Sequence, residues 1–449
     1  MTMVSAIQDW EQSFNNLCDT LINQLQENQY LVLELKAENS HFVRFNNAKV
    51  RQTGIVIDGQ VSIKMIANQR IAYMDFPLTG NRELDLSTAQ ECFDYLQTEI
   101  DQLPPDPYIV LPSDQGSSHE VYQGHLLDSN DALSHILPIV EGLDFTGFYA
   151  SGSLIRANYN SLGQKHWFAT DSFFVDYSLI NADNKAIKGC YSGTFWDDDA
   201  FEKQIEEQKV LLEQLNLPTR QLFPNSYRTY LAPAAVADLL SMFSWGAIGE
   251  ASIRQGGSVF NSMRQKGEKL SPLFNLQENF SRGSVPRFNN FGEIAPLHLP
   301  LFVEGELVNT LINSRTGKEY GLTSNGANGA ETLRSPEILA GNLKYEDILS
   351  AIDTGLYISN LHYLNWSDRP GGRVTGMTRY GCFWVEKGKI VATIKDLRFD
   401  DSIAQFFGKN LLALTDFQEF IPSIGTYGNR SLGGMLVPGI LLKSFTFTL

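Results

Sequence analysis

The length, composition and charge of this chain exclude several classes of protein. Of its 449 residues, 43% are apolar and 11% aromatic, which is enough to fill hydrophobic cores and excludes an intrinsically disordered chain. Its 51 acidic and 35 basic residues give a formal net charge of −16. This charge repels a phosphate backbone, so we expect no binding to nucleic acid.

The cysteines and the apolar segments predict a soluble, cytoplasmic protein. Cys18, Cys92, Cys190 and Cys382 lie far apart without a Cys-x-x-Cys pair, so neither a zinc knuckle nor a disulfide framework is predicted, and a reducing compartment fits. The first eleven residues lack the apolar core of a signal peptide. Residues 434–442 are too short to span a bilayer and are predicted to form one buried strand. We therefore expect no membrane contact.

The beginning of the chain is predicted to be a helix packed on a sheet. Apolar residues recur every three or four positions in residues 5–27, which predicts a helix with one apolar face. In residues 30–36, leucines at every second position alternate with Val, Glu and Lys, as expected for a strand. The sheet is predicted to continue through residues 42–51 and 54–65.

A second helix is predicted at residues 87–103, with Ser87 as its N-cap. Its inward side chains are expected to be Cys92, Tyr95, Leu96 and Ile100. Residues 104–124, rich in Pro, Ser, Asp and Gly, are predicted to be a loop.

A similar order of elements then recurs. A helix, three strands and a helix are predicted at residues 131–141, 147–158, 166–179, 187–193 and 200–215. Arg44-Phe-Asn46 and Arg156-Ala-Asn158 each accompany a long strand. These echoes are explained either by an internal duplication or by chance.

Pro218 and Pro224 place a domain boundary between residues 216 and 226. We therefore predict an α+β fold with two domains, an N-terminal helix and sheet domain at 1–217 and a strand-rich C-terminal domain at 218–449. The second domain is predicted to contain a helix that begins at Pro233, a helix at 344–354, and hairpin turns at Glu304-Gly-Glu306 and Glu386-Lys-Gly-Lys389.

Most motifs of catalytic chemistry are absent from the sequence. No Gly-x-Ser-x-Gly pentapeptide occurs, and Gly326-Ala-Asn-Gly329 lacks the lysine of a phosphate-binding loop. None of the seven histidines has the His-Glu-x-x-His spacing of a zinc site. His119-Glu120 and the nearby His125 are explained better by a solvated loop than by a metal site.

Two further groups are explained better by structure than by chemistry. Asp197-Asp-Asp199 precedes a predicted helix, where carboxylates complement the helix dipole, so capping is favoured over metal binding. Cys382 lies in an apolar strand without a close basic neighbour, so a buried structural thiol is favoured over a nucleophile.

Several stretches of the second domain carry a resemblance to a known family. The most specific is Thr378-Arg-Tyr-Gly-Cys-Phe-Trp-Val-Glu-Lys-Gly-Lys-Ile390. The others are residues 236–254, 303–312, 320–326 and 355–358. With these stretches the chain resembles the TldD/PmbA family (peptidase U62), peptidase-related proteins long labelled modulators of DNA gyrase, and in particular its PmbA (TldE) branch.

The resemblance implies that the metal ligands of the family are missing here. In the TldD branch, a His-Glu-x-x-x-His motif lies on the helix that matches residues 236–254, and a cysteine near the C-terminus completes the site. The matching positions of this chain hold Leu240, Trp245 and Leu432. We expect Trp245 to be buried in this helix, no metal or catalytic residue in this chain, and zinc only in a TldD-type partner.

By resemblance, this chain is the non-metal subunit of a TldD-family metalloprotease complex that degrades or processes unfolded peptides. Candidates for contact with a peptide or a partner are Glu250, Arg254, Asn325 and Arg379. Two alternatives stay open, a stand-alone homodimer that binds peptides without cleaving them, and a peptidase in its own right that uses Cys382 or Glu250.

Overall fold

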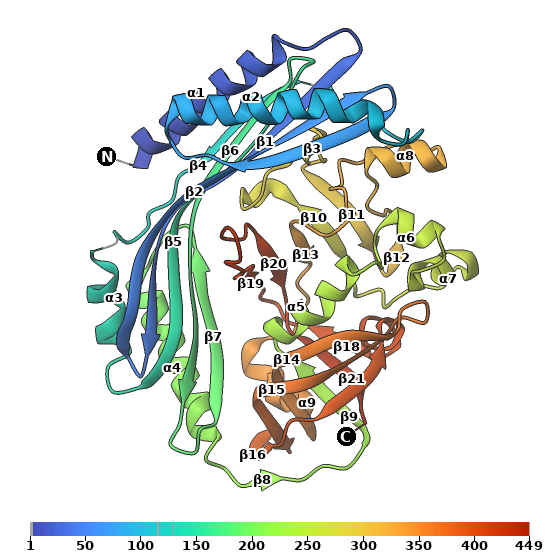
Figure 1. The fold of residues 1–449 in the computed structure, drawn as a ribbon. Helices are drawn as coiled ribbons and strands as arrows, with labels where there is room; N and C mark the ends of the chain where they lie inside the picture. The colour runs from blue at the N-terminus through green and yellow to red at the C-terminus, as the bar shows by residue number, and fades with distance from the viewer. Residues whose placement is uncertain (1–2, 115, 129, 449) are drawn as a thin grey trace.

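The first half of the chain builds one long, curved sheet (Figure 1). The computed structural model describes residues 3–114, 116–128 and 130–448. The strands of this sheet are β1 (Gln29–Asn46), β2 (Lys49–Ala67), β3 (Arg70–Pro77), β4 (Ser118–Tyr122), β5 (Asp144–Asn160), β6 (Lys165–Ile180) and β7 (Ala186–Gly193). Their order is β3-β2-β1-β5-β6-β4, with β7 also paired to β6. Neighbours are antiparallel except β4 and β6, which are parallel.

Four helices cover one face of this sheet. They are α1 (Met3–Ile22), α2 (Arg82–Glu99), α3 (Ala132–Ile139) and α4 (Asp198–Gln214). The first pair packs on one end of the sheet and the second pair on the other. The predicted recurrence of helix, three strands and helix is thus present, while its origin by duplication stays a prediction.

Alternation along the strands decides which side chains face away from these helices. Leu31, Leu33 and Leu35 pack in the core beneath α1 and α2, so Glu34 and Lys36 point to the opposite face. The second half of the chain lies against that face (Figure 1).

Local details of the first half differ from the prediction. The hairpin between β1 and β2 turns at Asn47 and Ala48, both with positive φ, so residues 51–54 lie inside a strand. Asn81, whose side chain accepts hydrogen bonds from two backbone N–H groups, caps α2 in place of Ser87. Tyr95 on this helix is exposed, whereas the other three predicted inward residues are buried.

The segment predicted as a loop at residues 104–124 contains β4. His119 and Glu120 are consecutive residues of this strand, so their side chains point to opposite faces. His119 contacts the Glu11 carboxylate at 3.2 Å, and Glu120 accepts a hydrogen bond from the Tyr122 hydroxyl. They do not form a joint site.

The second half of the chain builds two sheets. One has the order β12-β11-β10-β13-β20-β19, and the other β14-β9-β21-β17-β15-β16-β8 with β18 paired to β21. The strands are β8 (Thr219–Arg220), β9 (Asn225–Leu231), β10 (Leu276–Asn279), β11 (His298–Val303), β12 (Glu306–Leu307), β13 (Pro336–Ile338), β14 (Gly355–Asp368), β15 (Arg373–Glu386), β16 (Lys389–Ile394), β17 (Arg398–Ser402), β18 (Leu411–Leu414), β19 (Glu419–Pro422), β20 (Gly434–Val437) and β21 (Ile440–Phe447).

Short helices connect these strands. They are α5 (Pro233–Ser241), α6 (Glu250–Arg254), α7 (Val259–Lys266), α8 (Ser314–Tyr320) and α9 (Ile348–Ile352), with short turns η2 (Met242–Ser244), η3 (Phe280–Arg282), η4 (Tyr345–Asp347) and η5 (Gln405–Lys409). The short turn η1 (Ile100–Gln102) follows α2 in the first half. The predicted α+β fold class, with a strand-rich second half, is confirmed. The domain boundary at 217/218 stays a prediction.

Two predicted elements of the second half are broken. The helix expected at 236–254 ends after η2, because Gly246 has φ of +83°, and α6 begins only four residues later. The strand expected at 434–442 is split at Pro438-Gly439 into β20 and β21, which belong to different sheets.

The hairpin turns predicted at 304–306 and 386–389 are confirmed, with Gly305 and Gly388 at positive φ. In the described part of the chain, no helix is both long enough and apolar enough to cross a membrane.

Candidate functional site

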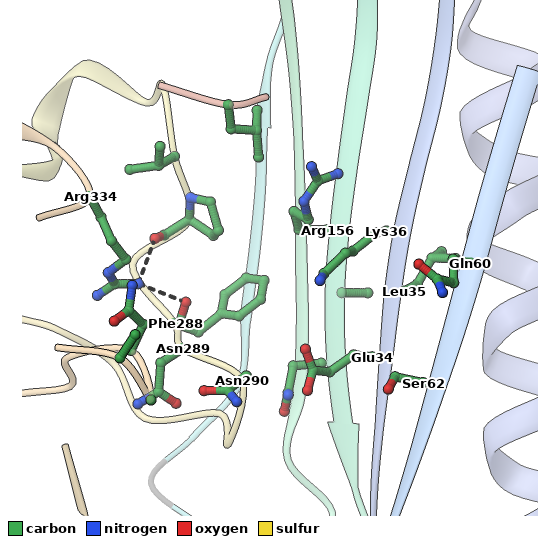
Figure 2. A pocket seen from close by; sticks show the side chains of 18 of the residues that line it. Glu34, Leu35, Lys36, Gln60, Ser62, Arg156, Phe288, Asn289, Asn290 and Arg334 are labelled. Atoms are coloured by element: carbon green, nitrogen blue, oxygen red, sulfur yellow. Dashed lines mark hydrogen bonds between the residues drawn. The ribbon is translucent and has the colours of Figure 1, made fainter. Parts of the chain in front are cut away.

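A cavity of about 730 Å³ lies where the open face of the first sheet meets loops of the second half (Figure 2). Its volume is within the ~300–1,000 Å³ typical of ligand pockets. The sheet side presents Glu34, Lys36, Gln60, Ser62 and Arg156 (Figure 2). The loop side presents Phe288, Asn289, Asn290, Arg334 and Leu432.

The sheet side carries an excess of positive charge. Lys36 on β1 lies directly opposite Arg156 on β5, an arrangement of like charges that costs free energy unless an anion relieves it. Neither forms an ion pair in the part of the chain that the structure describes. Burial lowers the pKa of Arg156 to about 10, while the charge of Glu38 opposes this shift, so the guanidinium stays charged at neutral pH.

One ion pair links the sheet to the loop. Lys64 pairs with Glu34 on the neighbouring strand and donates a second hydrogen bond to the Asn290 carbonyl at 3.1 Å. It also lies 5.0 Å from the centroid of the Phe291 ring. These contacts hold the tip of the loop against the sheet.

Arg334 fixes the shape of the loop side. Its guanidinium donates to the carbonyls of Pro286, Arg287, Phe288 and Gly326 at 2.9–3.3 Å, and Figure 2 shows two of these bonds. Burial lowers its pKa to about 10, opposed by the charge of Glu278. No sequence motif marked this arginine, because its partners are backbone atoms up to 48 residues away.

His166 and Asn158 lie where the first sheet meets the loop around Phe288. His166 stacks on Phe288 with ring centroids 5.0 Å apart, and its Nε2 is 3.0 Å from the Gly292 carbonyl. Asn158 lines the cavity, and its amide has no hydrogen-bond partner among the described residues. Asn158 belongs to the Arg-x-Asn pattern shared by residues 44–46 and 156–158, which suggested a duplication and gave no sign of a cavity.

Of the metal-site and contact positions proposed from the sequence, Leu432 alone lines this cavity. It also packs on the small apolar cluster of Phe280, Val285 and Ala295. Leu240 is fully buried in the main core of the second half. Trp245 is 54% exposed, so the expectation that it is buried is wrong, because the chain leaves the helix before this residue and turns at Gly246.

Glu250, Arg254 and Asn325 form one hydrogen-bonded network away from the cavity. Glu250 is only 2% exposed and accepts hydrogen bonds from Arg264 at 2.8 and 2.9 Å, from Arg254 at 2.7 Å and from the Thr310 hydroxyl at 2.6 Å. Asn325 donates to the Thr310 carbonyl at 2.6 Å. The Glu250 carboxylate is thus fully engaged within the fold.

The ionisation of Glu250 follows from these contacts. Burial raises the pKa of the Glu250 carboxyl. The hydrogen bonds from Arg264, Thr310 and Arg254 outweigh burial and lower this pKa to about 2. A carboxylate with such a low pKa is a weak base at neutral pH.

Arg379 and Cys382 lie on β15, apart from this network. Arg379 is exposed, and its guanidinium lies 5.5 Å from the Tyr380 ring centroid. The Cys382 thiol is buried and donates to the Arg379 carbonyl at 3.3 Å. Burial raises the pKa of Cys382 to about 12, so its reactive thiolate is scarce at neutral pH.

The Asp197 side chain caps α4 by accepting a hydrogen bond from the Ala200 N–H at 3.1 Å, as predicted. Among the described residues, no three His, Cys, Asp or Glu side chains gather as a metal site would require.

Comparisons with known proteins agree on the fold. Residues 224–449 match the family model of the PmbA/TldA metallopeptidase C-terminal domain. No curated protein matches the sequence of the chain.

Three solved structures resemble the whole chain. A protein assigned as a modulator of DNA gyrase from Thermotoga maritima has a TM-score of 0.76 at 15% identity, covering 97% of this chain and all of that one. TldE from Thermococcus kodakarensis has a TM-score of 0.75 at 12% identity, covering 97% of this chain and all of that one. A Bacteroides thetaiotaomicron protein, also assigned as a modulator of DNA gyrase, has a TM-score of 0.75 at 13% identity, covering 98% of each chain.

Proposed function

Because the chain belongs to the PmbA/TldD family, we propose that it is the subunit without a metal site in a cytoplasmic metalloprotease complex. Its partner is a TldD-type chain that carries the zinc, and the complex degrades or processes unfolded peptides. One observation carries the proposal. The chain matches the metallopeptidase C-terminal domain over residues 224–449, while the positions that by resemblance correspond to the family's metal site hold Leu240, Trp245 and Leu432.

The side chains at these positions do not fit zinc. A closed zinc site takes about four N, S or O ligands, and Leu240 and Leu432 offer none. Leu240 is enclosed in the core, whereas Trp245 is half exposed. Side chains at these two positions therefore do not share an environment in which both could bind one ion.

We expect the purified chain to contain well under one zinc per chain. The measurement is elemental analysis after desalting, with and without prior incubation in zinc. As a control, a TldD-type companion purified in the same way should retain its zinc. A full equivalent in this chain that resists chelation would contradict the proposal.

Mixing this chain with a zinc-bearing TldD-type companion should yield cleavage of an unstructured fluorogenic peptide that neither chain gives alone. The physical reason is that the companion supplies the metal and this chain completes the enclosure around the peptide. We expect a stable complex on gel filtration at micromolar concentration, with well over about 1,000 Å² buried. A companion whose motif glutamate is replaced by glutamine should form the same complex without cleaving.

Two outcomes separate the alternatives. A companion that is equally active alone, with no complex on gel filtration, would favour the stand-alone peptide-binding homodimer. Cleavage by this chain alone that persists with chelator and is lost in Cys382→Ala would favour a peptidase in its own right. The burial of the Cys382 thiol argues against this outcome.

A further inference from the structure

A second, smaller cavity lies between β6 and β7 of the first sheet and the segments 282–284 and 420–433 of the second half. Its volume is about 240 Å³. The residues that line it include Arg282, Arg430, Thr170, Ser284, Phe174 and Phe420. Two cations, polar donors and aromatic walls thus meet in one space.

Arg430 is buried, and one of its guanidinium nitrogens has no hydrogen-bond acceptor among the described residues. It is 3% exposed, and its Nη2 donates to the Gly152 carbonyl at 2.9 Å and to the carbonyl and hydroxyl of Ser172 at 2.9 and 2.8 Å. Its Nη1 has no hydrogen-bond partner among the described residues. Its contact with Glu38 runs through the backbone N–H, at 3.3 Å, and its guanidinium forms no ion pair within the described chain.

Residues that line the same cavity carry further buried donors without hydrogen-bond partners. Within the described chain, Arg282 Nε and Nη1, Ser284 Oγ and Thr170 Oγ1 also lack hydrogen-bond partners. Arg282 Nη1 lies 3.7 Å from Glu337, and its Nη2 donates to Ser335. Buried polar atoms in native folds nearly always have partners. Their concentration in one cavity points to a ligand that accepts hydrogen bonds.

The side chains that line the cavity limit the chemical class of its ligand. Arginine donors favour a carboxylate or a phosphate, while Phe174 and Phe420 favour an apolar group attached to it. A free phosphate would leave the aromatic walls uncovered. The cavity is also smaller than the ~300–1,000 Å³ of usual ligand pockets, which suits one residue of a chain.

We propose that this cavity binds the C-terminal residue of a peptide. The terminal carboxylate accepts hydrogen bonds from Arg430 Nη1, from Arg282 and from the Thr170 hydroxyl, and the last side chain packs on Phe174 and Phe420. This inference rests on the proposed function in taking peptides as ligands, and it adds a preference for a free C-terminus with an apolar last residue.

The test uses the isolated full chain and a fluorescein-labelled peptide of seven glycines and serines followed by phenylalanine. The peptide is made as the free acid and as the C-terminal amide, and binding is measured by fluorescence anisotropy. The acid should bind about tenfold or more tightly than the amide, as expected for the loss of one charge-assisted contact. Arg430→Gln should greatly reduce this difference, with Arg282 left as the one arginine that binds the carboxylate, while Arg51→Gln, an equal charge change at an exposed site, should keep it.

Thr170→Val gives a second variant that does not depend on how Arg430→Gln folds. It removes an unpartnered buried hydroxyl, so its thermal midpoint should stay equal or rise, while the free acid binds about threefold more weakly. Equal binding of acid and amide, no binding of either, or full affinity in both variants would each overturn the proposal. Displacement of both peptides by millimolar inorganic phosphate would instead assign the cavity to phosphate and overturn it.

The binding experiment contains no TldD-type companion. Its result can therefore refute the carboxylate site without refuting the proposed protease role, and the cleavage assay can do the reverse. If the chain binds the free acid but forms no active complex, the carboxylate site is supported and the proposed protease role is contradicted. If the chain forms the active complex but binds acid and amide equally, the protease role is supported and the carboxylate site is contradicted.

Discussion

Glu250→Gln is expected to lower the free energy of unfolding by about 3 kcal/mol at pH 7. The carboxylate is nearly inaccessible and accepts hydrogen bonds from two arginines and a threonine. Removing its charge leaves Arg264 without its anionic partner, and breaking a buried pair costs about 3–5 kcal/mol. Since Arg254 and Arg264 are each about 40% exposed and regain water, we expect the lower end of that range.

The pH dependence of this loss identifies its cause. The pKa of Glu250 is lowered from 4.5 to about 2, so its charge stabilises the fold above about pH 5 and this contribution is lost as the pH falls towards 2. The difference between wild type and Glu250→Gln, measured by urea unfolding from pH 7 to pH 2, should therefore shrink over that window. A difference that stays constant would mean that packing, and not charge, is responsible.

A surface carboxylate gives the matched control for this experiment. Glu206 on α4 pairs with Lys209 at 2.7 Å, but 58% of its side chain is exposed. Glu206→Gln should cost less than about 1 kcal/mol at every pH. If the control equalled Glu250→Gln, the network around Thr310 would not contribute as its geometry indicates.

Periodicity along the chain predicted which faces of the first sheet are buried. The leucines of residues 30–36 pack under the helices as the alternation indicated. The positions of turns were predicted less well, because they depend on single backbone conformations. Asn47-Ala48 turns at positive φ without a glycine, and Gly246 ends a helix whose apolar pattern continues past it.

The candidate site was hardly predictable because distant segments build it. Lys36 and Arg156 are 120 positions apart in the chain and become neighbours only when β1 pairs with β5. The loop side depends on Arg334, which binds backbone carbonyls that leave no pattern in the sequence. Among the proposed site positions Leu432 was the exception, since the family resemblance pointed to its position, and it lies at the cavity. Arg156 and Asn158 were noticed only as part of a repeated tripeptide, and that pattern did not indicate a cavity.

Phe243→Ala should lower the free energy of unfolding by about 3–5 kcal/mol, whereas Trp245→Ala, two residues later, should cost less than about 1 kcal/mol. Phe243 is fully buried, and its ring centroid lies 5.1–6.3 Å from those of Phe260, Phe274, Phe302 and Phe407. Deleting it leaves a cavity inside this aromatic cluster. Trp245 is half exposed. Its backbone carbonyl accepts a hydrogen bond from the Trp366 indole and its backbone N–H donates to the Met242 carbonyl, and alanine retains both groups.

Urea denaturation at two protein concentrations provides the measurement for both variants. A loss in Phe243→Ala that is independent of concentration is expected, because its partners all belong to the same chain. If Trp245→Ala instead proved as costly as Phe243→Ala, and only at high concentration, a second copy of the chain would have to cover Trp245. That outcome would contradict our expectation for this residue and favour the homodimer over the complex with a TldD-type companion.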